Sequence, residues 1–78
     1  MAIAADIAEI DRIVLQQLHD EIEPITVPRL YEKLFPKLSE LDQRIGRPDV
    51  VASIWRLVDA GDAELRHDRK VWAKRRQS

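Results

Sequence analysis

Apolar side chains in the first twenty residues recur every three or four positions, with no glycine or proline between them. This stripe consists of Ile3, Ile7, Ile10, Val14 and Leu18, and it is widened by Ile13 and Leu15. Such a spacing places side chains on one face of an α-helix, so we expect an amphipathic helix over residues 3–20. Pro24 limits that helix, because a residue before proline is pushed out of the helical region.

A short strand and a second helix are expected next. The run Ile25-Thr26-Val27 is β-branched and favours a very short strand. Pro28 then fits the first turn of a helix, where its missing N–H is harmless. We expect Leu30, Leu34 and Tyr31 of this helix to face the core.

The connection to a third helix is predicted to be long. We expect the second helix to end at Phe35, because Pro36 follows it. The run Ser39–Asp42 is a weak capping-box pattern that predicts one separate helical turn, which Gly46 stops. Eleven residues then separate Phe35 from Arg47, whereas a compact helix-turn-helix uses about three or four.

Residues 48–60 show the clearest helical pattern in the chain after that of residues 3–20. Pro48 and Asp49 suit the beginning of a helix, and Gly61 suits its C-terminal cap. The apolar stripe of this third helix consists of Val50, Ile54, Leu57 and Val58.

A β-hairpin is predicted after Gly61, since residues 62–65 and 70–73 flank a polar tip. Its register stays open between two possibilities. A two-residue turn places Leu65 opposite Trp72, and a three-residue turn places Leu65 opposite Val71.

The order helix, short strand, helix, helix, glycine and hairpin resembles that of a winged helix-turn-helix domain. The resemblance is most specific over residues 54–65, IWRLVDAGDAEL, and it spans roughly residues 3–74. In that family the recognition helix ends in leucine, a few small or polar residues and glycine, and runs straight into the first wing strand. The resemblance implies a mainly α fold with a small β-hairpin, in which a C-terminal wing accompanies a three-helix core. We expect residues 1–78 to form one such domain, with a basic, mobile tail at 75–78.

Composition excludes several other classes of protein. The chain has no cysteine, which excludes disulfide scaffolds and thiolate zinc sites. We expect His19 and His67 to be solvated surface residues. Since no metal-ligand spacing, paired nucleophile or phosphate-binding glycine pattern occurs, we expect no enzyme, cofactor, metal or small-molecule substrate. Without a long apolar run or a basic leader, we expect no membrane association and a cytoplasmic location, nucleoid-associated if the source is a bacterium or phage.

Charge is distributed unevenly along the chain. Residues 1–43 hold nine acidic and four basic side chains, a net charge of −5, and residues 44–78 hold five acidic and nine basic ones, a net charge of +4. The total of −1 argues against a binder that coats nucleic acid by bulk charge. The division predicts two electrostatically different surfaces.

The resemblance implies double-stranded DNA as the partner, with helix 48–60 in the major groove and the wing at 62–74 on phosphate or the minor groove. With the apolar stripe turned inward, Ser53 and Arg56 are expected on the outer face. The expected DNA-binding residues are Arg44, Arg47, Ser53, Arg56, Arg66, His67, Arg69, Lys70, Lys74, Arg75 and Arg76. We therefore expect a small transcriptional regulator or accessory factor.

Two further expectations concern protein contacts. Ile13 and Leu15 extend the first stripe beyond what one core needs, which favours a homodimer through helix 3–20. The alternative function is a winged-helix protein-interaction module that does not bind DNA, with Trp55, expected to be half exposed, and the acidic first helix as its contact surface. Trp72 is expected to pack in the core or the wing.

Overall fold

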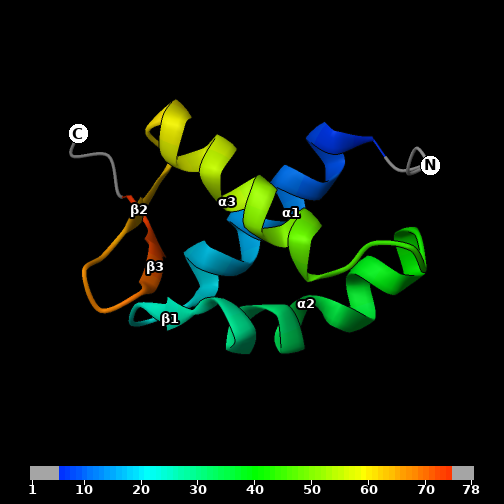
Figure 1. Cartoon of the computed structure of the whole chain (residues 1–78), viewed down its shortest axis with the longest axis horizontal. Coiled ribbons are helices and arrows are strands. Elements are labelled where there is room, and N and C mark those ends of the chain that lie inside the picture. Colours follow the sequence, from blue (N-terminus) through cyan, green and yellow to red (C-terminus); the bar gives the residue numbers. More distant parts are fainter. Residues whose placement is uncertain (1–5, 75–78) are drawn as a thin grey trace.

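The computed structural model describes residues 6–74, which form three α-helices and a three-stranded antiparallel sheet. The elements in chain order are α1 (Ile7–Asp20), β1 (Ile25–Thr26), α2 (Val27–Leu41), α3 (Arg47–Ala60), β2 (Ala63–Leu65) and β3 (Lys70–Ala73). Figure 1 shows the predicted arrangement, mainly α with a C-terminal wing. Ile3 and the predicted tail at 75–78 lie outside the described residues.

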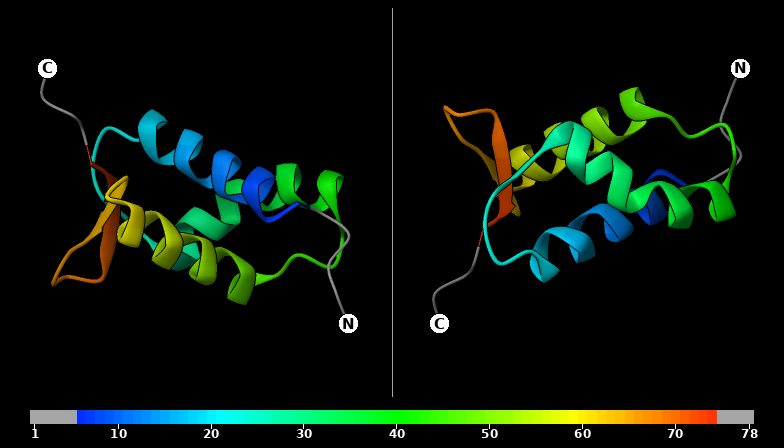
Figure 2. Two further views of the ribbon diagram at one scale, coloured as in Figure 1. Left: turned by 90° about the horizontal axis from the view of Figure 1, so that it is seen from above. Right: turned by 90° about the horizontal axis from the view of Figure 1, so that it is seen from below.

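The three helices enclose one core, and the hairpin stands at one end of them (Figure 2). α1 and α3 lie side by side, and α2 packs against both. Each helix contributes one buried stripe, as its periodicity predicts. The largest contributions come from Ile10, Val14, Leu18, Leu30, Leu34, Leu38, Val50, Ile54 and Leu57. Ile13 and Leu15 are partly buried against this core, so both already have packing partners within the chain.

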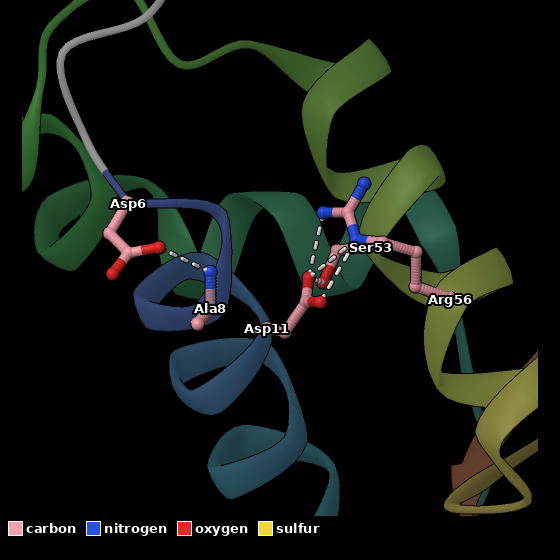
Figure 3. A network of polar contacts seen from close by, with 5 residues as sticks. All are labelled: Asp6, Ala8, Asp11, Ser53 and Arg56. Carbon is pink, nitrogen blue, oxygen red and sulfur yellow. Dashed lines mark hydrogen bonds and ion pairs between the residues drawn. The ribbon is translucent and has the colours of Figure 1, made fainter.

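The helix α1 begins at Ile7, and residues 3–5 of the predicted helix lie outside the described residues. Asp6 adopts an extended conformation, and its side chain accepts a hydrogen bond from the Ala8 N–H at 3.0 Å (Figure 3). This contact caps the helix by satisfying one of its free N–H groups. Ile7, which we expected in the buried stripe, is therefore in the first turn and is exposed.

The second helix continues through Pro36 to Leu41, so the predicted end at Phe35 is wrong. Proline removes one backbone hydrogen bond, but Pro36 lies on the exposed side of α2, where solvent reaches the backbone. Burial of Leu38 favours continuation of the helix on its other side. The Ser39 hydroxyl also donates to the Phe35 carbonyl at 2.8 Å.

The separate turn predicted at 39–42 is also wrong, because Ser39 and Leu41 belong to the last turn of α2. Only residues 42–46 connect α2 to α3. Ile45 is buried within this loop and anchors it to the core. The Asp49 carboxylate then accepts from the Gly46 N–H at 2.8 Å at the start of α3. The helix-turn-helix is thus more compact than the sequence indicates.

The hairpin adopts the register with the three-residue turn, because Leu65 pairs with Val71. Arg69 has a positive φ of 65° in this turn, the left-handed conformation that often closes three-residue hairpin loops. Gly61, with φ 83°, ends α3 as predicted. β3 is the central strand, since β1 pairs with it on the other side, with Thr26 opposite Lys70.

Candidate functional site

Ser53 and Arg56 face α1, which corrects their predicted place on the outer face of α3. The Ser53 hydroxyl is fully buried and donates to Asp11 Oδ1 at 2.6 Å (Figure 3). The Arg56 guanidinium donates to both Asp11 oxygens, with Nη2 at 2.7 Å from Oδ1 and Nε at 2.9 Å from Oδ2. The side chains of Ser53 and Arg56 therefore lie on the side of α3 that faces α1, where both bind Asp11.

Helical geometry explains the position of Ser53. Ser53 is three residues after Val50 and next to Ile54, so it lies within the buried stripe of α3. A buried hydroxyl needs a hydrogen-bond partner, and Asp11 on the side of α1 that faces α3 provides it. The apolar spacing of α3 therefore indicates that the Ser53 side chain points into the protein. The hydrogen bond between Ser53 and Asp11, in contrast, follows only from the packing of α1 on α3.

The same network sets the charge of Asp11. Partial burial raises the pKa of its carboxyl, but hydrogen bonds from Arg56 and Ser53 outweigh burial and bring the Asp11 pKa below its ordinary value. The hydrogen bonds that Arg56 donates to Asp11 correspondingly raise the pKa of Arg56. Asp11 and Arg56 therefore form an ion pair in which both are charged. Because Arg56 is already paired, we do not count it among the cations available to a ligand.

The outer face of α3 is apolar apart from its two ends. Pro48, Ala52 and Trp55 are exposed along it, and Asp59 lies near its C-terminal end. Arg47 is the cation of this face, and its guanidinium lies 5.9 Å from the centroid of the Tyr31 ring. Trp55 is 52% exposed, which confirms its expected half exposure.

An apolar cleft of about 240 Å³ separates this face from the wing. Its lining consists of Val27, Val51, Ile54, Trp55, Leu65, Arg66 and Arg69. The cleft therefore combines a carbon-rich wall from three elements with two guanidinium groups contributed by the hairpin tip.

Basic side chains gather where the wing meets the start of α2. We call Arg29, Arg66, Arg69 and Lys70 the wing cluster. Thr26 pairs with Lys70, and this register places Arg29 and Lys70 on one open hollow of about 260 Å³, lined also by Glu21 and Glu23.

The members of the wing cluster differ in their existing partners. Arg66 forms an ion pair with Asp68 at 3.5 Å and lies 5.9 Å from the Trp72 ring centroid. Arg29, Arg69 and Lys70 are exposed and have no ion-pair partner within residues 6–74. Glu21, which lines the same hollow as Arg29 and Lys70, forms an ion pair with Lys33 at 3.0 Å, and the charge of Arg29 also contributes to lowering the Glu21 pKa.

Arg29 is a site residue that sequence reasoning missed. It belongs to the acidic half of the chain, and it reaches the wing only through the pairing of β1 with β3. No local pattern around Arg29 indicates that pairing, which joins strands more than forty residues apart in the chain.

The remaining predicted DNA-binding residues are dispersed. Arg44 is paired with Asp42 in the loop before α3, at 3.1 Å. His67 and Lys74 are exposed, whereas Arg75 and Arg76 lie outside the described residues. Trp72 lies on the outer side of β3 and is 42% exposed.

Other kinds of site were sought in the described part of the chain. Within residues 6–74, no group of three or more His, Cys, Asp or Glu side chains is placed to hold a metal ion. None of the helices described is long and apolar enough to cross a membrane. His19 and His67 are both exposed, as predicted.

Comparison of the chain with protein families, curated proteins and solved structures finds no match.

Proposed function

We propose that this protein is a winged-helix DNA-binding protein that contacts the phosphates of duplex DNA through its wing cluster. The observation that carries the proposal is that Arg29 and Lys70 share one open hollow at the start of α2, with the exposed Arg69 next to Lys70 in the chain. None of these three cations has an ion-pair partner within residues 6–74. Cations concentrated on one surface displace the counterions of DNA and supply most of non-specific affinity. Such a surface binds duplex DNA despite a net charge of −1.

The start of α2 supports the same proposal. Its first turn contains no acidic residue, and its N-cap Thr26 makes no side-chain capping hydrogen bond. The partial positive charge of a helix N-terminus favours a nearby anion. Together with Arg29 and Lys70, this end of α2 attracts a phosphate group, and the carboxylates of Glu21 and Glu23 line the same hollow.

The apolar outer face of α3 limits the kind of DNA recognition that we propose. Reading of base edges in the major groove relies mostly on Arg, Lys, Asn, Gln and acidic side chains. Val51, Ala52 and Trp55 offer no such groups, and Arg56 is bound to Asp11. We therefore propose a sequence-tolerant accessory factor more readily than a repressor of one operator.

A salt titration with mixed-sequence duplex DNA tests the proposal. Six cations (Arg29, Arg47, Arg66, Arg69, Lys70 and Lys74) predict a log–log slope of affinity against salt near −5, at about −0.9 per phosphate contact. The triple variant R29Q/R69Q/K70Q is expected to reduce that slope by about 3 units. The control R12Q/K37Q/R44Q removes the same charge elsewhere and is expected to change the slope far less.

Two results contradict this proposal. One is the absence of duplex binding at low salt, and the other is an equal loss in both triple variants. The first result favours the alternative of a protein-interaction module that does not bind DNA, for which the specific support is the apolar face around Trp55.

A further inference from the structure

The cleft between α3 and the wing exposes apolar surface that the core does not use. Trp55 is 52% exposed and Leu65 37% exposed on its two sides, and Val27 and Val51 are half-buried between them. Contiguous apolar surface in a concave site marks an interaction surface more often than scattered apolar residues do.

The size and chemistry of the cleft restrict its occupant. Its volume of about 240 Å³ is below the range of roughly 300–1,000 Å³ typical of small-molecule pockets. Apart from Arg66 and Arg69, every lining residue presents carbon or an indole ring. A base edge buried there would lose hydrogen bonds to water without replacement. One or two apolar side chains of a protein fit this wall better.

The rim of the cleft restricts the occupant further. Arg69 has no ion-pair partner within residues 6–74, and the Arg66 side chain remains 43% exposed beside Asp68. Guanidinium groups bind carboxylates and phosphates with planar, charge-assisted hydrogen bonds, and on a protein segment the matching groups are Asp and Glu side chains.

We propose that this cleft binds a segment of another protein that carries one or two aliphatic or aromatic side chains flanked by Asp or Glu. Trp55 and Leu65 provide the apolar contact, and Arg66 and Arg69 select the acidic flanks. Arg66 and Arg69 also belong to the wing cluster, so a bound segment and duplex DNA exclude one another. The docking itself does not require that the protein binds DNA.

Selection from a random-sequence peptide library against the whole protein tests this inference. The enriched peptides are expected to contain apolar anchors between acidic residues. Their affinity is expected to fall about tenfold or more for W55A and for R66E/R69E. The control F35A removes another exposed aromatic ring, which does not line the cleft, and is expected to change affinity by less than about twofold.

Folding of each variant is checked by circular dichroism, and L65S provides a second apolar test if W55A does not fold. The inference is overturned if no peptide is enriched, if the enriched peptides are basic, or if W55A and F35A lose affinity equally. It is also overturned if duplex DNA, and not peptide, depends on Trp55. Peptide binding without any duplex binding supports the inference while contradicting the proposed DNA function, and displacement of duplex by peptide supports both.

Discussion

Ser53 Oγ lies 2.6 Å from Asp11 Oδ1, although the two residues are 42 positions apart in the chain. This hydrogen bond joins α1 to α3 beside the ion pair between Asp11 and Arg56. Since a helix is rigid about its own axis, fixing Ser53 inward also fixes which residues point outward. Trp55 and Val51 therefore face the wing, while Arg56 faces α1.

Removing the Asp11 carboxylate is expected to destabilise the fold. Asp11→Ala leaves the buried Ser53 hydroxyl without its partner, and we expect the free energy of unfolding to fall by about 1–3 kcal/mol. Solvent screens the ion pair, because the Arg56 side chain is 39% exposed, so most of this loss comes from Ser53. Urea denaturation measures the change. Glu9→Ala, which removes the exposed partner of Arg12, is the control and is expected to lose less.

Acid is expected to weaken the same network. The Asp11 pKa is lowered in the folded state, so its contribution to stability is present above the ordinary carboxyl pKa of about 3.9 and is lost as pH falls through the folded value. Asp11→Asn cannot titrate at this position. The difference in unfolding free energy between the wild type and Asp11→Asn is therefore expected to shrink below about pH 4. A constant difference from pH 6 to pH 3 would contradict this assignment.

Replacing Pro36 is expected to stabilise the protein. Because Pro36 lies inside α2 and lacks an N–H, Pro36→Ala restores one helical hydrogen bond and should raise the free energy of unfolding by about 1–3 kcal/mol. Thermal and urea denaturation both measure the gain. If α2 ended at Phe35, the substitution would instead free the unfolded chain and lower stability slightly.

Arg56 and Arg69 are expected to differ in their effects on DNA affinity. Under the proposed function, Arg69→Gln removes one phosphate contact and reduces the salt slope by about 0.9. Arg56→Gln should leave the slope unchanged, because Asp11 already holds that guanidinium. A slope for Arg69→Gln equal to that of the wild type would show that Arg69 does not contact phosphate.

The elements that the sequence predicts well are those whose periodicity agrees with their packing. α3 and the hairpin follow apolar spacing and the position of Gly61, which are local signals, and α1 follows its apolar spacing except at its start. α2 is the exception, because Pro36 indicates an end to the helix locally while Leu38 is buried by the tertiary fold. At Pro36 the packing of Leu38 outweighs the low helix propensity of proline, so the helix continues. The separate turn predicted at 39–42 is therefore part of α2.

The candidate site is harder to predict from the sequence than the helices and the hairpin are. Ser53 lies within the buried stripe of α3, so its inward position follows from its spacing with Val50 and Leu57. The partnership of Arg56 with Asp11 and the approach of Arg29 to Lys70 depend on contacts between distant segments. Dividing the chain by charge at residue 43 places Arg29 in the wrong half and counts Arg56 as available.

The central position of β3 has a consequence for the order of folding during synthesis. Ile25 and Thr26 leave the ribosome long before Lys70 and Val71, their partners in the sheet. The residues of all three helices are therefore synthesised before the partner strand of β1 exists, and until then β1 has an unpaired edge. Because β3 pairs with both other strands, Arg29 and Lys70 can share their hollow only after β3 has joined the sheet.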